Sequence, residues 1–88
     1  MKRTVNKVPL ESVLSLLYGF TWIIIEDRKN SDMYKDNAPD TRKWKGFVKD
    51  VWKACDEVRY KWMKSQVHQI WHKENCIVFV ISTEFEEY

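Results

Sequence analysis

Hydrophobic and polar positions follow a recognisable pattern in three stretches of the chain. Between Pro9 and Gly19, apolar side chains recur at helical spacing, with a proline suited to the first turn and a glycine suited to the end. Residues 20–27 are an aromatic and β-branched run that ends in charge, and residues 76–84 place such side chains on two alternating faces. The pattern predicts a short N-terminal helix and two strands.

The segment 41–74 carries a longer pattern. It contains no proline, Asp40 or Thr41 can cap its beginning, and Asn75 suits a left-handed position after its end. At about 100° per residue, two apolar stripes with different directions follow each other. The first stripe comprises Trp44, Phe47, Val48, Val51, Ala54, Cys55, Val58 and Trp62, and the second comprises Tyr60, Met63, Val67, Ile70 and Trp71. The spacing predicts a long helix that is kinked or broken near Tyr60.

These elements predict a single α+β domain over residues 1–88, with a short N-terminal helix, two to three β-strands and the long helix packed on the sheet. A short extended piece at 3–8 would supply the third strand, since two strands make a poor sheet. A helix between two strands suggests a right-handed parallel crossover. However, about 33 helical residues span roughly 50 Å, against about 27 Å for an eight-residue strand. Either the helix folds in two, which allows an antiparallel pair, or it projects beyond the sheet.

Aromatic content is high for this length. Five Trp, four Tyr and four Phe would saturate the core of an 88-residue domain, and any that stay outside would form a sticky patch. By contrast, 15 Lys and Arg against 13 Asp and Glu give a net charge of +2, which does not demand nucleic acid or an anionic membrane as partner. The aromatic surplus therefore points to a binding surface.

The chain has no charge-free apolar run long enough to span a bilayer and no complete signal peptide. We therefore expect a cytoplasmic protein without a membrane segment. Its two cysteines, Cys55 and Cys76, are expected to be reduced thiols, because one disulfide is unusual inside the cell.

His68, His72 and Cys76 recur every four residues and could form a metal site, with Cys55 as a conceivable fourth ligand. Cys55 belongs to the other stripe, and no CxxC pair is present. Histidines that face solvent beside a buried thiol are the better explanation of the spacing. We therefore expect no metal and no other cofactor.

Enzymatic activity finds little support in the sequence. Asp27 and Lys29 resemble the acidic-x-Lys element of metal-dependent nucleases, but nothing places a second carboxylate beside them. No nucleophile motif is present, and with only Gly19 and Gly46 a phosphate-binding loop cannot be built. The sequence predicts a protein that is not an enzyme.

The leading functional hypothesis is a protein-binding module, such as a small inhibitor or adaptor. Its contacts would come from the second apolar stripe and from the polar loop 28–40. The expected contact residues are Tyr60, Met63, Val67, Ile70 and Trp71 in the helix and Met33 and Tyr34 in the loop. Alternatively, a kink returns the helical residues to the core. A protein partner is expected, a homodimer is compatible, and the size suits an accessory protein of a virus or mobile element that blocks a host enzyme.

The alternative hypothesis is nucleic-acid binding through the first half of the expected helix. Basic residues form a ridge there, consisting of Arg42, Lys43, Lys45, Lys49 and Lys53. Because the ridge is mostly Lys, binding would be non-specific and sensitive to salt. Three acidic residues interrupt the ridge, which equally suits a solvated face.

Overall fold

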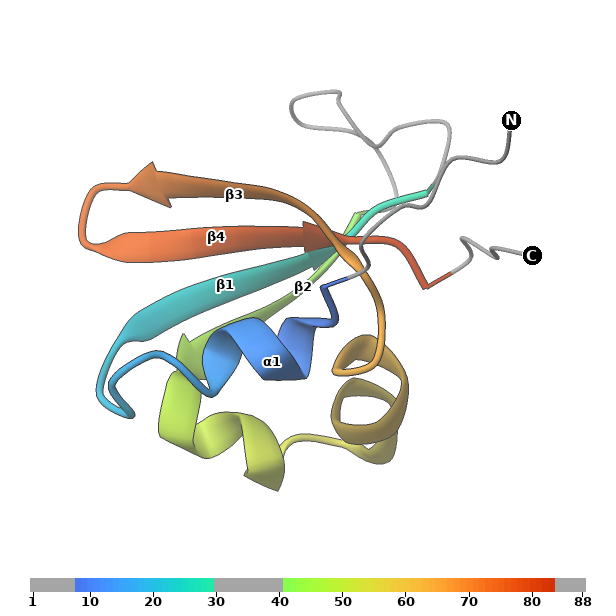
Figure 1. Cartoon of the computed structure of the whole chain (residues 1–88), viewed down its shortest axis with the longest axis horizontal. Coiled ribbons are helices and arrows are strands. Elements are labelled where there is room, and N and C mark those ends of the chain that lie inside the picture. The colour runs from blue at the N-terminus through green and yellow to red at the C-terminus, as the bar shows by residue number, and fades with distance from the viewer. Residues whose placement is uncertain (1–7, 30–40, 84–88) are drawn as a thin grey trace.

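A computed structural model of the chain describes residues 8–29 and 41–83 (Figure 1). The elements in these ranges are α1 (Leu10–Leu14), β1 (Trp22–Asp27), β2 (Arg42–Phe47), the 3₁₀ helix η2 (Val48–Lys53), the π-helix η3 (Glu57–Trp62), β3 (Val67–Lys73) and β4 (Cys76–Ile81). The strands form one mixed sheet in the order β2-β1-β4-β3. β1 and β4 are parallel, whereas β1 pairs with β2 and β3 pairs with β4 in antiparallel fashion.

The prediction of a long helix over 41–74 is wrong. β2, η2, η3 and β3 occupy this segment, and the longest helices in the described ranges have six residues. In β2, Lys43 and Lys45 alternate with Trp44 and Gly46, which is the two-residue period of a strand. Trp44 and Phe47 are aromatic residues that favour strands, and pairing of β2 with β1 outweighs the helical preference of its lysines. The fold is a four-stranded mixed sheet with short helices.

The strands predicted at 20–27 and 76–84 are confirmed as β1 and β4. They are parallel neighbours at the centre of the sheet, with Ile23 opposite Ile77. The predicted N-terminal helix is confirmed as α1, which is only five residues long. Most of the extended piece expected at 3–8 lies outside the described residues.

One face of the sheet, here called the inner face, packs against α1, η2 and η3 (Figure 1). Strand alternation places Ile23 and Ile25 of β1 on this face together with Phe79 and Ile81 of β4. The helices and the turn after η3 complete the core with Leu10, Leu14, Val48, Val51, Val58, Trp62 and Met63. The opposite, outer face carries Trp22, Ile24, Glu26, Lys43, Lys45, Phe47, Trp71, Lys73, Cys76, Val78 and Val80.

Candidate functional site

The residues predicted to bind a protein partner do not come together on one surface. Met63 is fully buried in the core, and Val67 packs against the core. Met33 and Tyr34 lie outside the described residues. The single helical face that joined the other members does not exist, because they belong to η3 and β3.

Three of the predicted contact residues are exposed but separated from one another. Tyr60 lies on η3, where the Arg59 guanidinium is 5.0 Å from the centroid of its ring. Ile70 and Trp71 are exposed neighbours in β3 and therefore point to opposite faces of the sheet. Their role in partner binding stays a prediction.

The predicted basic ridge is divided between a strand and a 3₁₀ helix. Lys43 and Lys45 lie on the outer face of β2, while Lys49 and Lys53 follow in η2. The Lys53 ammonium lies 3.9 Å from the Asp50 carboxylate. The four lysines therefore do not share one helical face.

Arg42, the remaining member of the ridge, is part of an ion-pair network around Asp27. The Asp27 carboxylate accepts hydrogen bonds from the Thr83 N–H and hydroxyl, each 2.9 Å long, and from the Arg42 guanidinium at 2.5 Å. Arg42 also pairs with Glu57 at 2.7 Å. The hydrogen bond to Asp27 is the main cause that raises the pKa of Arg42 above its ordinary value.

This network gives Asp27 a structural role. The carboxylate is buried and engaged by three protein donors. It is therefore poorly placed to act as the metal-holding group of an acidic-x-Lys element. Within residues 8–29 and 41–83, no three His, Cys, Asp or Glu side chains gather as metal ligands. Cys55 is an exposed free thiol and Cys76 a buried one.

Four aromatic side chains instead form a continuous, largely exposed group, here called the aromatic cluster: Tyr18, Phe20, Trp22 and Phe47. Ring centroids are 5.5 Å apart between Tyr18 and Phe20, and 6.0 Å apart between Phe20 and Phe47. Trp22 meets Phe47 edge to face at 5.0 Å. Tyr18 is 73% exposed, Phe20 58% and Trp22 43%. The Lys49 ammonium lies 5.2 Å from the centroid of Phe20, within cation–π range.

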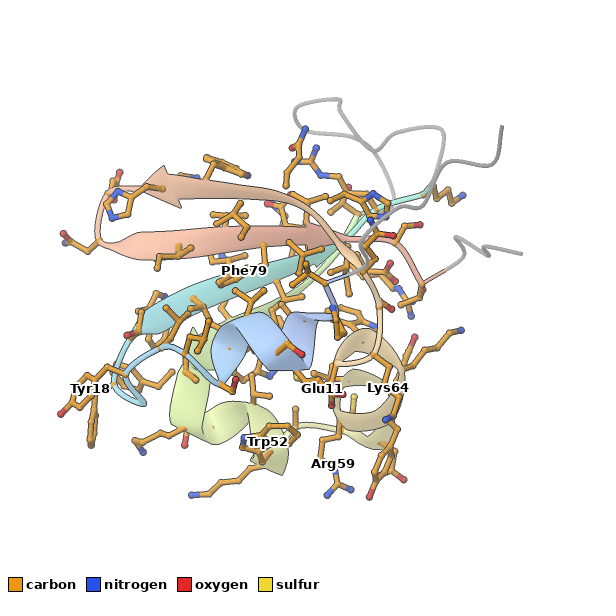
Figure 2. The ribbon with its side chains drawn as sticks, viewed as in Figure 1. Glu11, Tyr18, Trp52, Arg59, Lys64 and Phe79 are labelled. Carbon is orange, nitrogen blue, oxygen red and sulfur yellow. The ribbon has the colours of Figure 1, made fainter. Side chains whose placement is uncertain are left out.

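Backbone hydrogen bonds hold the turn that carries the cluster. The Thr21 N–H donates to the Tyr18 carbonyl at 2.9 Å and closes the turn. The Val48 N–H donates to the Thr21 carbonyl at 3.0 Å, and the Lys49 N–H donates to the Gly19 carbonyl at 2.9 Å. These bonds attach the turn to the start of η2. Figure 2 shows Tyr18 projecting at one end of the molecule, away from Phe79 in the core.

The sequence contained a partial indication of this cluster. Tyr18, Phe20 and Trp22 are spaced by two residues, which places them on one side of an extended chain. The sequence pattern instead predicts a helix end and a buried strand at these positions. Phe47 joins them only through the sheet register, in which it lies opposite Trp22. Sequence reasoning could not supply that pairing because it placed Phe47 in a helix.

Beside Trp22, the outer face has an open depression of about 290 Å³. Its lining consists of Trp22, Ile24, Lys73, Glu74, Asn75 and Cys76. The lining thus combines apolar side chains of β1 with charged and amide groups at the turn between β3 and β4. A planar apolar wall faces groups that can donate and accept hydrogen bonds.

Comparison with known protein families, with curated proteins and with solved structures finds no match to this chain. In the ranges that the structure describes, no helix is long and apolar enough to cross a membrane.

Proposed function

We propose that this protein is a non-enzymatic protein-binding module and that the aromatic cluster is its contact surface. The observation that carries the proposal is the joint exposure of Tyr18, Phe20 and Trp22 on a turn held by backbone hydrogen bonds. Trp and Tyr are enriched among the residues that contribute most to binding at protein interfaces. A turn that is ordered before binding also loses less conformational entropy in the complex.

The surroundings of the cluster indicate the chemistry of the partner. Leu16, two residues before Tyr18 in the chain, is a further apolar side chain that is 85% exposed. Lys45, on the outer face of β2, adds positive charge at the border of the cluster, whereas Lys49, over Phe20, is paired with Asp50 at 3.3 Å. A suitable partner therefore presents an apolar hollow with carboxylates at its rim. A cytoplasmic inhibitor or adaptor, acting by occupying such a hollow, is the form of this function that we favour.

Capture from extracts of the native source tests the proposal. The bait proteins are the wild type, the double variant Tyr18→Ser/Phe20→Ser and the control Trp52→Ser. Trp52 is 54% exposed but lies on η2, so it matches Phe20 in exposure and not in position. Loss of a buried aromatic anchor at an interface costs about 2 kcal/mol or more, which is roughly 30-fold in affinity.

The expected result is a partner that the wild type and Trp52→Ser retain and the double variant loses. Circular dichroism must show that all three proteins are folded. Equal retention by a folded double variant would contradict the proposal. Light scattering of the purified wild type separates a different partner from a second copy of this chain. A dimer that the double variant cannot form would make the second copy the partner.

A further inference from the structure

Lysine side chains are in excess on the outer face of the sheet. Lys43 and Lys45 lie on this face in β2, and Lys73 lies on it at the end of β3. Lys45 and Lys73 make no ion pair within the described ranges. The Lys43 ammonium is 3.8 Å from Glu26, a carboxylate that Arg28 already neutralises at 2.7 Å. The face is therefore positive locally, although the chain as a whole is nearly neutral.

The register combines these lysines with aromatic side chains in two neighbouring rows across the four strands. From β2 to β3, one row contains Lys45, Ile24, Val78 and Trp71, and the next contains Phe47, Trp22, Cys76 and Lys73. Each row thus has a tryptophan and a lysine on an otherwise apolar surface. With strands about 4.8 Å apart, Lys45 and Trp71 are separated by roughly 14 Å at the backbone.

The depression of about 290 Å³ lies in the second row, between Trp22 and the turn at Glu74 and Asn75. Its volume exceeds that of one nucleobase. The Trp22 indole, 43% exposed, offers a surface for stacking, and the Asn75 amide can both donate and accept at the edge of a base. Lys73 stands beside it, where a phosphate linked to that base would need a cation.

We propose that the outer face binds single-stranded nucleic acid, with one unstacked base in the depression against Trp22 and neighbouring phosphates at Lys45 and Lys73. Sheet faces that combine exposed aromatics with lysines bind single strands by stacking and by charge neutralisation. A duplex hides its base faces and cannot fill the depression. An acidic protein segment would match the lysines but would leave the tryptophan wall and the Asn75 amide without a planar partner. The inference does not depend on the protein partner proposed above.

Fluorescence anisotropy with labelled oligo-dT and oligo-rU of roughly 12 nucleotides tests the inference, since this length lies within the site sizes of single-strand binders. A duplex of equal length is the comparison. Single strands should bind at least tenfold more tightly than the duplex. With two lysines at phosphates, raising salt from 50 to 200 mM should weaken binding about 7-fold, given a slope of about 0.7 per phosphate.

Two double charge reversals distinguish binding at the proposed site from non-specific electrostatic attraction. Lys45→Glu/Lys73→Glu should weaken binding at least tenfold and flatten the salt dependence. The control Lys53→Glu/Lys64→Glu changes two highly exposed lysines outside the sheet and should bind like the wild type. Asn75→Ala should change the relative affinity for oligo-dT and oligo-dA. Equal loss in both lysine pairs would overturn the inference.

Further variants and competitors test the proposed binding of single strands. Trp22→Ala should weaken binding about tenfold, as expected for the loss of one stacked base. No binding of the folded wild type to single strands at 50 mM salt would overturn the inference, as would equally effective competition by polyglutamate. Tyr18→Ser/Phe20→Ser should bind oligonucleotides normally, and Lys73→Glu alone should weaken oligonucleotide binding but retain the protein partner. These two variants therefore distinguish failure of this inference from failure of the proposed function.

Discussion

Replacing Asp27 tests whether the network at the end of β1 stabilises the fold. In Asp27→Ala, the Thr83 N–H and hydroxyl and the Arg42 guanidinium lose their common acceptor. Hydrogen bonds to a charged group contribute about 1.5–3 kcal/mol each. Arg42 is half exposed, keeps its pair with Glu57 and can be hydrated. Losing its hydrogen bond to Asp27 therefore costs little free energy. The main cost comes from Thr83, and we expect the free energy of unfolding to fall by about 2–3 kcal/mol.

A loss of this size is large for a small domain. Domains of this class are stable by about 5–15 kcal/mol, and each kcal/mol corresponds to about 4–8 °C in melting temperature. Asp27→Ala should therefore melt roughly 10–20 °C below the wild type. Asp27→Asn keeps an acceptor for the Thr83 N–H but loses the charge, and should cost about 1–2 kcal/mol.

Urea denaturation followed by circular dichroism gives the free energies, and thermal melts give the midpoints. Asp56→Ala is the matched control, because Asp56 pairs with Arg59 but is exposed, and its midpoint should equal that of the wild type. If Asp27→Ala is as stable as Asp56→Ala, the three donors do not stabilise the fold. The structural role assigned to Asp27 would then be refuted.

Three further predictions concern the core, a turn and the thiols. Phe79→Ala should lower the free energy of unfolding by about 3–5 kcal/mol in urea titrations, because the ring is 1% exposed in the core. Glu74 has a φ of 50°, so Glu74→Gly should relieve strain in the hairpin turn and raise that free energy by about 0.5–1 kcal/mol in the same titrations. In a thiol titration, the exposed Cys55 should react at once, whereas the buried Cys76, which donates to the Lys73 carbonyl at 3.2 Å, should react only in denaturant. A rate for Cys76 equal to that of Cys55 in the native protein would contradict its burial.

The central strands could be predicted because their composition favours a strand over a helix. β1 and β4 each contain consecutive β-branched and aromatic residues over a length too short for a stable helix. Such runs suit strands buried between two neighbours in a sheet. The position of α1 followed from Pro9 and the apolar spacing behind it.

The prediction of a long helix over 41–74 is wrong because the apolar residues of its short elements are spaced as in an α-helix. Val48 and Val51 are three residues apart in a 3₁₀ helix, and Val58 and Trp62 are four apart in a π-helix. Both spacings fit one face of an α-helix. The extended residue Ala54 ends the first of these helices, and no glycine or proline indicates the break at this point.

In the second half of that segment, β3 could not be predicted because its own residues give only a weak strand signal. β3 contains His, Gln and Lys, which have little preference for strands, and its turn to β4 has Glu where hairpins usually have Gly. Only pairing with the strongly strand-forming β4 makes β3 a strand. The candidate site depended on the same pairings, because the register aligns Phe47 with Trp22 and brings Lys73 to the depression.

The parallel pairing of β1 with β4 also sets an order of events during synthesis. β1 is made before β2, whereas β4 follows β2, both short helices and β3. Until β4 is made, one edge of β1 stays unpaired, and Ile23 and Ile25 lack Phe79 as a core neighbour. Unpaired edges of this kind favour association with other chains. The newly made chain is therefore vulnerable to aggregation until β4 is complete, and closure of the core must wait for a contact between distant parts of the sequence.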